Sequence, residues 1–324
     1  MESPLLEVID LKTYFFTLEG VVKAVDEVSF TVNRGEVFGI VGESGSGKTI
    51  TSLSILRLIP PPSGKIIAGK ILFKGEDLLE KSSKEMRSYR GSRISMVTQD
   101  PMTSLNPVYR VGNQIMEAIA FHQALKRRDQ KEKVVEMMRL VQIPSPEMRI
   151  KEYPHQFSGG MRQRAMIAMS LSCQPDLLIA DEPTTALDVT IQAQILRLMK
   201  EVQNVFGTAI IFITHDLGIV ANMCDRVAVM YAGKIVEQAD VRTIFHSPRH
   251  PYTRGLMNSI PKLGEGKERL EAIDGQPPDL GNLPPGCDFS PRCPSVLPFC
   301  RQEKPGTETL SKDHEIRCFR WREE

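Results

Sequence analysis

The eight residues from Gly42 to Thr49, GESGSGKT, constrain this chain more than any other segment, because they fit the pattern G-x-x-x-x-G-K-[S/T]. The motif directly follows a predicted strand at 36–41 and leads into a predicted helix at 51–58. Glycines let backbone N–H groups close around phosphate oxygens, and the following helix presents the positive end of its dipole. The context therefore predicts a loop that binds the phosphates of a nucleotide, rather than an ordinary glycine-rich turn.

Two side chains of this loop have specific predicted roles. Lys48 can reach the β- and γ-phosphates, and the hydroxyl of Thr49 can take a coordination position on Mg²⁺. We expect the whole loop to contact the nucleotide, namely Gly42, Glu43, Ser44, Gly45, Ser46, Gly47, Lys48 and Thr49.

The loop lies within a long stretch of α/β character. From Leu5 to about Ile244, short β-rich runs alternate with longer amphipathic runs, which indicates a mainly parallel sheet with helices. Several runs are almost continuously apolar, as strands buried on both faces should be. These runs are 36–41, 93–98, 176–181, 208–214 and 226–231. Two further runs, at 21–32 and 65–73, predict an antiparallel β-subdomain beside the parallel core.

A helical insert and a distinct C-terminal region complete the predicted organisation. Helical periodicity dominates between Gly112 and Cys173, with the clearest helices at 113–128 and 130–143. After Pro248 the character changes, and eight of the 22 prolines fall between 277 and 305, where regular helix is not expected. With 324 residues, roughly two domains are expected. We place a nucleotide-binding domain at 1–247, with a helical subdomain at about 100–175, and an extension at 248–324.

Charge and hydropathy exclude some function classes. The 41 Lys and Arg against 40 Asp and Glu give a net charge of +1, so no uniform field favours nucleic acid as a partner. The N-terminus lacks a basic segment followed by an apolar one, and no apolar run is long enough to span a bilayer. We expect a soluble, cytoplasmic protein that can still dock on a membrane partner.

Two further segments carry candidate chemistry. The apolar run DLLIADEP ends in Asp181 and Glu182, which predicts two carboxylates at the carboxyl end of a buried strand, where α/β folds bind ligands. Asp181 would serve Mg²⁺ and Glu182 would polarise a water as general base; a plain strand-to-loop transition is the alternative. FSGGMRQR at 157–164 places a Ser and two Gly at a predicted helix start, which is either a second anion site or only a helix cap.

Taken together, these motifs resemble those of the ATP-binding subunits of ATP-binding cassette (ABC) transporters, in the same order along the whole chain. GESGSGKT resembles Walker A, Gln99 the Q-loop glutamine, FSGGM the LSGGQ signature and DLLIADE Walker B. TALD at 185–188 is similar to the D-loop, and His215 to the switch histidine. The resemblance implies a P-loop ATPase fold that binds ATP and Mg²⁺ and acts as a dimer.

The resemblance also implies a role for each motif. ATP would bind between two subunits, with the Walker A loop of one facing Ser158, Gly159 and Gly160 of the other, and Asp188 would contribute from the D-loop. His215 would contact the γ-phosphate and hold the attacking water in line. Gln99 would serve the metal site and link it to the helical insert, which in the family faces the transmembrane subunits.

An aromatic residue near the N-terminus usually stacks on adenine in this family. Tyr14, Phe15 and Phe16 all compete for this role. By spacing from the predicted strand AVDEVSF we favour Phe15, with Tyr14 second, although a core role for these rings is the alternative.

Further matches point to one branch of the family. QDPMTSLNP at 99–107, YPHQFSGGMRQR at 153–164 and HPYT at 250–253 resemble the dipeptide/oligopeptide permease branch, which also contains nickel importers. Phe157 and Met161 depart from the usual Leu and Gln of the signature, but the Ser-Gly-Gly core is intact. The implied partners are a second ATPase subunit, identical or homologous, two transmembrane permeases and an extracytoplasmic peptide-binding protein. The resemblance thus implies a peripheral subunit on the cytoplasmic face of the membrane.

Four cysteines crowd into the last 38 residues, at Cys287, Cys293, Cys300 and Cys318. In a reducing compartment such crowding favours a metal over disulfides, and four thiolates suit either Zn²⁺ or a 4Fe-4S cluster. The spacing C-x5-C-x6-C-x17-C lacks the C-x2-C pairs of zinc ribbons, which disfavours zinc. Peptide-permease ATPases resemble this tail, and the resemblance implies the 4Fe-4S cluster. Zn²⁺, unliganded thiols and disulfides are the alternatives.

Two other functions compete with peptide import. One is a soluble ABC-type ATPase that acts on DNA or ribosomes, but such proteins usually carry tandem cassettes or coiled-coil insertions, and this sequence shows one cassette and no heptad array. The other is a redox-sensing module in which the cluster is the function and ATP is regulatory.

Overall fold

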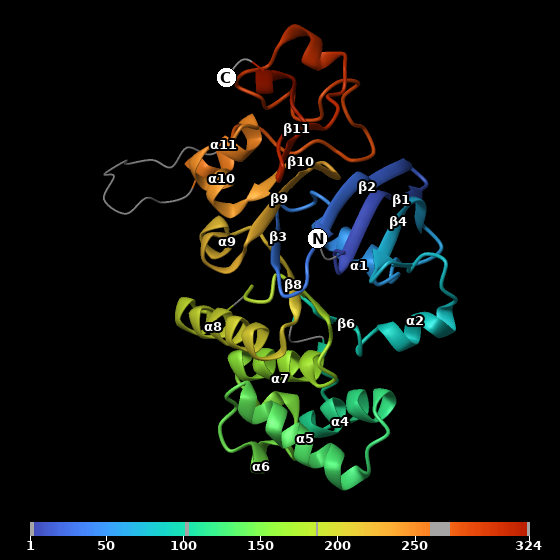
Figure 1. The fold of residues 1–324 in the computed structure, drawn as a ribbon, viewed down its shortest axis with the longest axis vertical. Coiled ribbons are helices and arrows are strands. Elements are labelled where there is room, and N and C mark those ends of the chain that lie inside the picture. The colour runs from blue at the N-terminus through green and yellow to red at the C-terminus, as the bar shows by residue number, and fades with distance from the viewer. Residues whose placement is uncertain (1–2, 101–103, 186, 260–272, 323–324) are drawn as a thin grey trace. The chain divides into compact units, whose positions relative to one another are not determined.

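A computed structural model describes residues 3–100, 104–185, 187–259 and 273–322. The chain folds into two compact units, one formed by 1–33, 37–79 and 213–324, and the other by 34–36 and 80–212. Each unit combines strands and helices, as the alternating sequence pattern predicts (Figure 1). Within the described ranges, no helix has the length and apolar character needed to cross a bilayer.

The first unit contains two sheets. An antiparallel sheet has the order β2-β1-β4-β5 and confirms the predicted β-subdomain. In the other, the strands follow the order β11-β12-β10-β9-β3, with β3 and β9 parallel and the others antiparallel. The strands are β1 Leu6–Thr17, β2 Gly20–Val32, β3 Val37–Val41, β4 Gly64–Phe73, β5 Glu76–Asp77, β9 Arg226–Tyr231, β10 Lys234–Asp240, β11 Glu308–Ser311 and β12 His314–Ile316. The helices are α1 Lys48–Ile55, α9 Leu217–Met223, α10 Val241–His246 and α11 Pro251–Asn258, with 3-10 turns η2 Pro298–Arg301 and η3 Phe319–Arg322.

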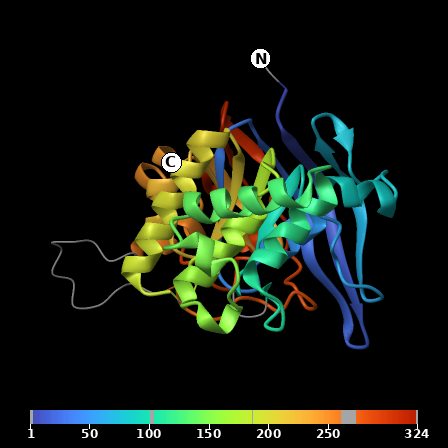
Figure 2. The same ribbon diagram turned by 90° about the horizontal axis from the view of Figure 1, so that it is seen from below.

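The second unit places its helices beside short parallel strands. Its strands are ordered β8-β7-β6, and β6 pairs with β7 in parallel register. They span β6 Ile94–Val97, β7 Leu177–Asp181 and β8 Ala209–Thr214, the last two residues of which belong to the first unit. The helices are α2 Ser83–Tyr89, α4 Val111–His122, α5 Arg127–Leu140, α6 Pro146–Arg149, the 3-10 turn η1 Pro154–Gln156, α7 Gly159–Leu171 and α8 Val189–Phe206. Helices α4, α5 and α7 pack on one another and form the predicted helical insert (Figure 2).

One predicted helix is shorter than the sequence pattern indicates. The helix expected over 113–128 ends at His122, and Gln123 is extended. The reason lies in the burial pattern, because α4 buries Ile115 and Ile119 while α5 buries a separate face that begins at Val134. The chain must turn between the two faces so that both can reach α7, and residues 123–126 form that turn.

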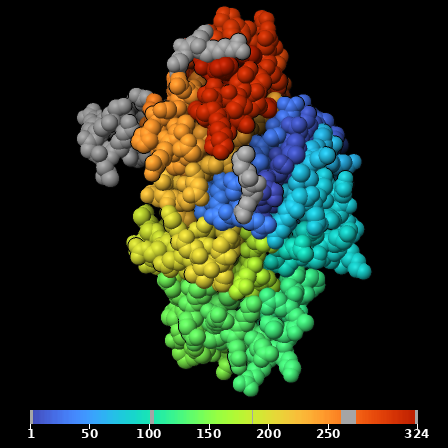
Figure 3. All heavy atoms as spheres, in the orientation of Figure 1, coloured from blue at the N-terminus to red at the C-terminus, as the bar shows by residue number. Residues whose placement is uncertain are grey.

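The C-terminal region packs closely against the rest of the first unit. Strand β12 pairs with β10, and Phe289 packs against Tyr231 of β9 and Tyr252 of α11, with ring centroids 5.1 and 5.4 Å away. In the space-filling view, the red C-terminal residues lie directly against the orange residues of α10 and α11 (Figure 3). Of the described residues between 277 and 305, only η2 is regular, in agreement with the proline content.

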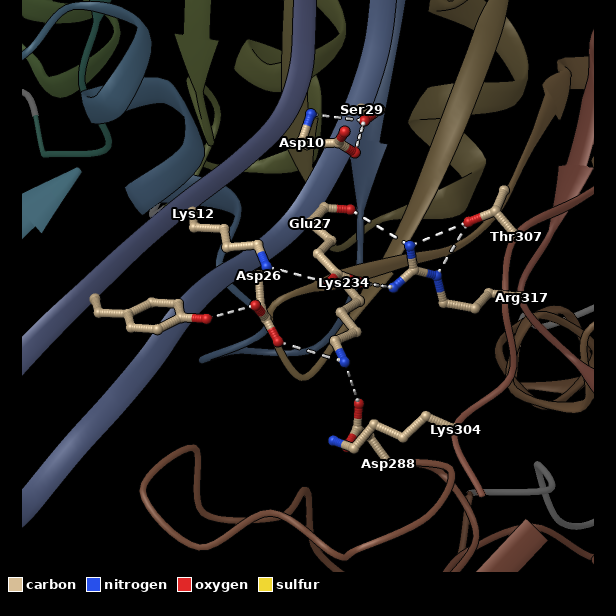
Figure 4. Close-up of polar contacts among 11 residues, drawn as sticks. Asp10, Lys12, Asp26, Glu27, Ser29, Lys234, Asp288, Lys304, Thr307 and Arg317 are labelled. Atoms are coloured by element: carbon tan, nitrogen blue, oxygen red, sulfur yellow. Dashed lines mark hydrogen bonds and ion pairs between the residues drawn. The ribbon is translucent and has the colours of Figure 1, made fainter. Parts of the chain in front are cut away.

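A buried chain of charges also joins this region to the N-terminal strands (Figure 4). Lys234, whose side chain is 7% exposed, lies 3.4 Å from a carboxylate oxygen of Asp26 and 3.4 Å from one of Asp288. Asp26 also accepts a 2.6 Å hydrogen bond from Tyr14, and Asp288 pairs with Lys304. Burial disfavours the charge on Asp26, but the Tyr14 hydroxyl and Lys234 together leave the pKa of Asp26 below its usual value.

Replacing Lys234 by alanine should therefore destabilise the first unit strongly. The change leaves the buried carboxylates of Asp26 and Asp288 without their shared cation, which should lower the free energy of unfolding by about 3 kcal/mol or more. Urea unfolding of the purified protein measures the effect. Lys304→Ala is the matched control, since Lys304 is 42% exposed and its pair with Asp288 should contribute less than about 1 kcal/mol. Equal losses in the two variants would contradict the role given to Lys234.

Candidate active site

The predicted phosphate-binding loop has the expected position between β3 and α1 of the first unit. All five residues of β3 are buried, and α1 begins at Lys48. Gly42 and Gly47 have φ values of 156° and 104°, and a β-carbon on either would come within 2.3 Å of a backbone oxygen. Only glycine fits at these two positions, so the motif glycines are dictated by the shape of the loop.

Lys48 lies inside this loop. Its side chain is 6% exposed, and its ammonium donates hydrogen bonds of 2.8 Å to the carbonyl of Gly42 and 2.9 Å to that of Glu43. The amine thus lies against the backbone that the motif provides for phosphate. Thr49, at the start of α1, is exposed to solvent, while the hydroxyl of Ser46 is buried and makes no hydrogen bond. The loop thus holds a buried ammonium, that of Lys48, and a buried hydroxyl, that of Ser46, which makes no hydrogen bond within the protein. Both groups are suited to bind the phosphate oxygens of a nucleotide.

His215 is in the same unit, directly after β8. Its side chain is exposed, and it is the following residue, Asp216, that caps α9 by accepting from the backbone N–H groups of Gly218 and Ile219. His215 is thus not a core residue, and its part in catalysis stays a prediction.

The second unit brings together Asp181, Glu182 and Gln99. Asp181 is the last residue of β7 and is 2% exposed, and Glu182 follows with an unusual φ of 46°. One carboxylate oxygen of Glu182 accepts hydrogen bonds of 3.0 Å from the Gln99 amide and 3.0 Å from the Thr185 hydroxyl. The acids and the glutamine belong to separate motifs of the sequence, and the structure adds Thr185, whose hydroxyl donates to the same carboxylate.

The signature and D-loop segments also meet in this unit. Ser158 caps α7, its hydroxyl accepting from the backbone of Met161, and Asp188 caps α8 in the same way through Ile191. A β-carbon on Gly160 would come within 2.8 Å of Ile191, so glycine is needed where the two helices approach. Ala186, within the predicted D-loop, lies outside the described residues.

The departures from the signature consensus have a simple structural reading. Phe157, in place of the usual Leu, is 2% exposed, so an apolar side chain is kept at a buried position. Ser158 and Gly159 are exposed at the start of α7, where the backbone of a helix N-terminus can meet an anion.

Of the three N-terminal aromatics, Tyr14 has the most specific environment. Its hydroxyl donates to Asp26, and the Lys23 ammonium lies 5.7 Å from its ring centroid. Phe15 is partly buried in β1, where it pairs with Val22 and Gly64, and Phe16 is 46% exposed. Which ring stacks on adenine, with Phe15 preferred, stays a prediction.

The four C-terminal thiols influence one another electrostatically. Burial raises the pKa of Cys287 to about 12, and the thiols of Cys318 and Cys300 add to the shift. Burial also raises the pKa of Cys293, with a contribution from Cys300. In the described ranges, however, no three Cys, His, Asp or Glu side chains are arranged to hold one metal ion. The predicted metal-binding role of this region is therefore not shown by the geometry.

Comparison with known proteins places these motifs in a family. The family model for ABC transporters matches residues 25–185, and the model for the oligopeptide/dipeptide transporter C-terminal region matches residues 236–300. The chain is 54% identical to the dipeptide transport ATP-binding protein DppD of Bacillus subtilis, over 97% of this chain and 94% of that protein. A probable peptide ABC transporter ATP-binding protein of Sinorhizobium fredii is 55% identical, over 98% and 95%.

The chain belongs to the ATP-binding proteins of peptide ABC transporters.

Solved structures agree on the fold of this ABC ATPase. A dimeric ATP-binding cassette, MJ0796, bound to ADP and Pi, matches with a TM-score of 0.66 at 22% identity, over 73% of this chain and 99% of that chain. A cassette of Clostridium perfringens, cbiO1, matches with a TM-score of 0.64 at 28% identity, over 76% and 92%. The α/β P-loop fold predicted from the sequence is thus confirmed.

Proposed function

We propose that this ABC ATPase hydrolyses ATP to drive the import of dipeptides and oligopeptides through partner permeases. The observation that carries the proposal is the fixed carboxylate of Glu182, which follows the buried Asp181 and is held by Gln99 and Thr185. A carboxylate held at the carboxyl end of a buried strand is well suited to take a proton from water. The match of 236–300 to the peptide-transporter C-terminal region, and the names of the relatives, support peptides as cargo.

The loop and the acids have complementary roles in this proposal. Lys48 and the backbone of the loop would bind the phosphates, and Thr49, Gln99 and Asp181 would hold Mg²⁺, which would supply positive charge for the phosphates. Glu182 accepts the proton of the attacking water, and His215 orients that water against the γ-phosphate. Phe15 or Tyr14 stacks on the adenine.

The exposure of the signature supports a dimeric site. Ser158 and Gly159 lie at the solvent-exposed start of α7. They can therefore contact the nucleotide of a second ATPase subunit, identical or homologous. Gly160 and Asp188 would contribute to the same site. The remaining partners are two permeases and an extracytoplasmic peptide-binding protein, and the ATPase lies on the cytoplasmic face of the membrane.

Reconstitution tests the proposed function. The ATPase, its two permeases and the binding protein are placed in proteoliposomes, and uptake of labelled dipeptides, longer peptides and Ni²⁺ is measured with ATP inside or absent. In the proteoliposomes we expect ATP-dependent peptide uptake and a rate of ATP hydrolysis that rises when peptide is added. For the isolated ATPase subunit, we expect the rate of hydrolysis per subunit to fall on dilution. Uptake of Ni²⁺ alone would favour the nickel alternative, and full ATPase activity in a strictly monomeric sample would contradict the dimeric site.

We also propose that Cys287, Cys293, Cys300 and Cys318 hold a 4Fe-4S cluster, with Zn²⁺ as the alternative. The chemistry of the donors supports this proposal, since the last 38 residues hold four thiols, and neighbouring thiols contribute to the raised pKa of Cys287, Cys293 and Cys318. Loading requires that the thiols lose their protons. Since the described side chains are not arranged to hold a metal ion, the segment would also rearrange around the bound group. The cluster would add folding free energy to a region with little regular structure.

Anaerobic purification tests the cluster. The protein should be brown, with broad absorption near about 400 nm and equal iron and acid-labile sulfide, because iron–sulfur centres are held by thiolates. Serine at any of the four positions should bleach the colour, whereas Cys173→Ser and Cys224→Ser serve as controls and should not. Stoichiometric zinc without iron would overturn the cluster assignment.

A further inference from the structure

Glu43 places a carboxylate inside a loop that binds phosphates. It is the second residue of the motif, and its side chain is 29% exposed. An uncompensated negative charge there would repel the triphosphate, because two like charges a few ångströms apart near a protein surface interact by several kcal/mol. The loop therefore needs a cation for Glu43 that is independent of Lys48, whose ammonium is engaged with the backbone carbonyls of the loop.

Arg292 of the C-terminal region supplies this cation. Its guanidinium makes a two-pronged ion pair with Glu43, with N–O distances of 2.6 and 3.0 Å, although the residues are 249 positions apart. The Arg292 side chain is only 4% exposed. Its remaining donors reach the carbonyls of Ile273 and Asp274, so the fork is held in one orientation. Paired, planar contacts of this kind are the strongest that an arginine makes with a carboxylate.

A second contact holds the backbone at the same residue. The hydroxyl of Tyr252, from α11, accepts a 3.0 Å hydrogen bond from the backbone N–H of Glu43. Tyr252 is fully buried, and its ring centroid lies 4.6 Å from that of Tyr231 and 5.4 Å from that of Phe289. The guanidinium of Arg292 lies 5.8 Å from the Tyr231 ring centroid. A rigid aromatic group thus supports both contacts to the loop.

We infer that Arg292 and Tyr252 are positioning residues of the nucleotide site, through which the C-terminal region controls the affinity of the loop for ATP. Arg292 cancels the charge of Glu43 so that the triphosphate can approach, and Tyr252 fixes the backbone of the loop at the same point. The inference rests on the proposed ATPase function and assigns to this site two residues outside its sequence motifs. Neither residue touches the nucleotide in this assignment, and both act through Glu43.

A charge cycle tests the inference. Each variant is made in a Glu182→Gln background, so that bound ATP is not consumed, and the Kd for MgATP is measured by calorimetry. Arg292→Gln should weaken binding by about tenfold, since Glu43 then repels the phosphates. Adding Glu43→Gln to this variant should restore the Kd to within about threefold of the parent. The defect of Arg292→Gln should also shrink between about 50 mM and 500 mM NaCl, because salt screens a charge that is partly exposed.

Controls and contrary outcomes separate this role from a merely structural one. Arg301→Gln removes an exposed arginine of the same segment and should bind as the parent does. Tyr252→Phe should weaken binding a few-fold, independently of salt. An unchanged Kd in Arg292→Gln, or a defect that neither Glu43→Gln nor salt relieves, would overturn the inference while leaving the ATPase function intact. If Arg292→Gln does not fold, the double variant decides, since parental affinity supports the inference and lost affinity overturns it. A parent that does not bind MgATP would overturn both.

Discussion

Glutamine in place of Glu182 should slow ATP hydrolysis by about a hundredfold or more while ATP remains bound. The amide keeps the size of the side chain but cannot accept a proton from water. The carboxylate is well placed for this task, because it lies directly after the buried end of β7 and one of its oxygens is fixed by Gln99 and Thr185. Steady-state hydrolysis in the assembled transporter and retention of labelled ATP measure the two halves of the prediction. The variant should accumulate as an ATP-bound dimer.

Glu201→Gln is the control for this experiment. Glu201 is an exposed acid on α8 of the same unit, and its replacement should leave turnover unchanged. Turnover of Glu182→Gln at the parental rate would show that another group accepts the proton.

Alanine in place of Lys48 should have a different effect, with a loss of nucleotide affinity of at least about tenfold. The lysine charge acts on the phosphates of bound ATP before any chemistry occurs, so its removal weakens binding itself. The Lys48 ammonium is buried and hydrogen-bonded inside the loop, so the charge of a lysine on the protein surface cannot take over its role. Equilibrium titration with a fluorescent ATP analogue measures the change. Lys84→Ala, at an exposed position on α2, is the control, and equal affinity in both variants would contradict the role of the loop.

The parallel strands and the phosphate-binding loop could be predicted from the sequence because their signals are local. The apolar run before Gly42 is long enough to indicate a buried strand, and the observed β3 covers its last five residues. The glycines at 42 and 47 are needed by the backbone itself, so they are visible in any chain that forms this loop. The acids after β7 were found for the same reason, since a buried strand that ends in carboxylates is a short, continuous pattern.

The contacts to Glu43 could not be predicted in this way. Nothing near Glu43 in the sequence indicates that its partner is Arg292, and nothing in the proline-rich tail distinguishes Arg292 from Arg301. The strands β11 and β12 were also missed, because they have four and three residues and carry too few side chains to show an alternating pattern. The ion pair of Glu43 and the pairing of β12 with β10 depend on where distant parts of the chain meet, which a single sequence does not reveal.

The pairing of β12 with β10 has a consequence for truncation of the protein and for exchange of its C-terminal region with that of a relative. Residues 314–316 give the hydrogen-bonding groups along one side of β10 a partner. A chain truncated after residue 247 would leave the hydrogen-bonding groups on this edge of β10 unpaired. It would also expose the side of the Tyr231 ring that packs against Phe289. A bare strand edge next to apolar surface invites pairing with other chains. Shortened forms of the protein should therefore self-associate, and a tail exchanged between relatives should be tolerated only if it brings its own closing strand.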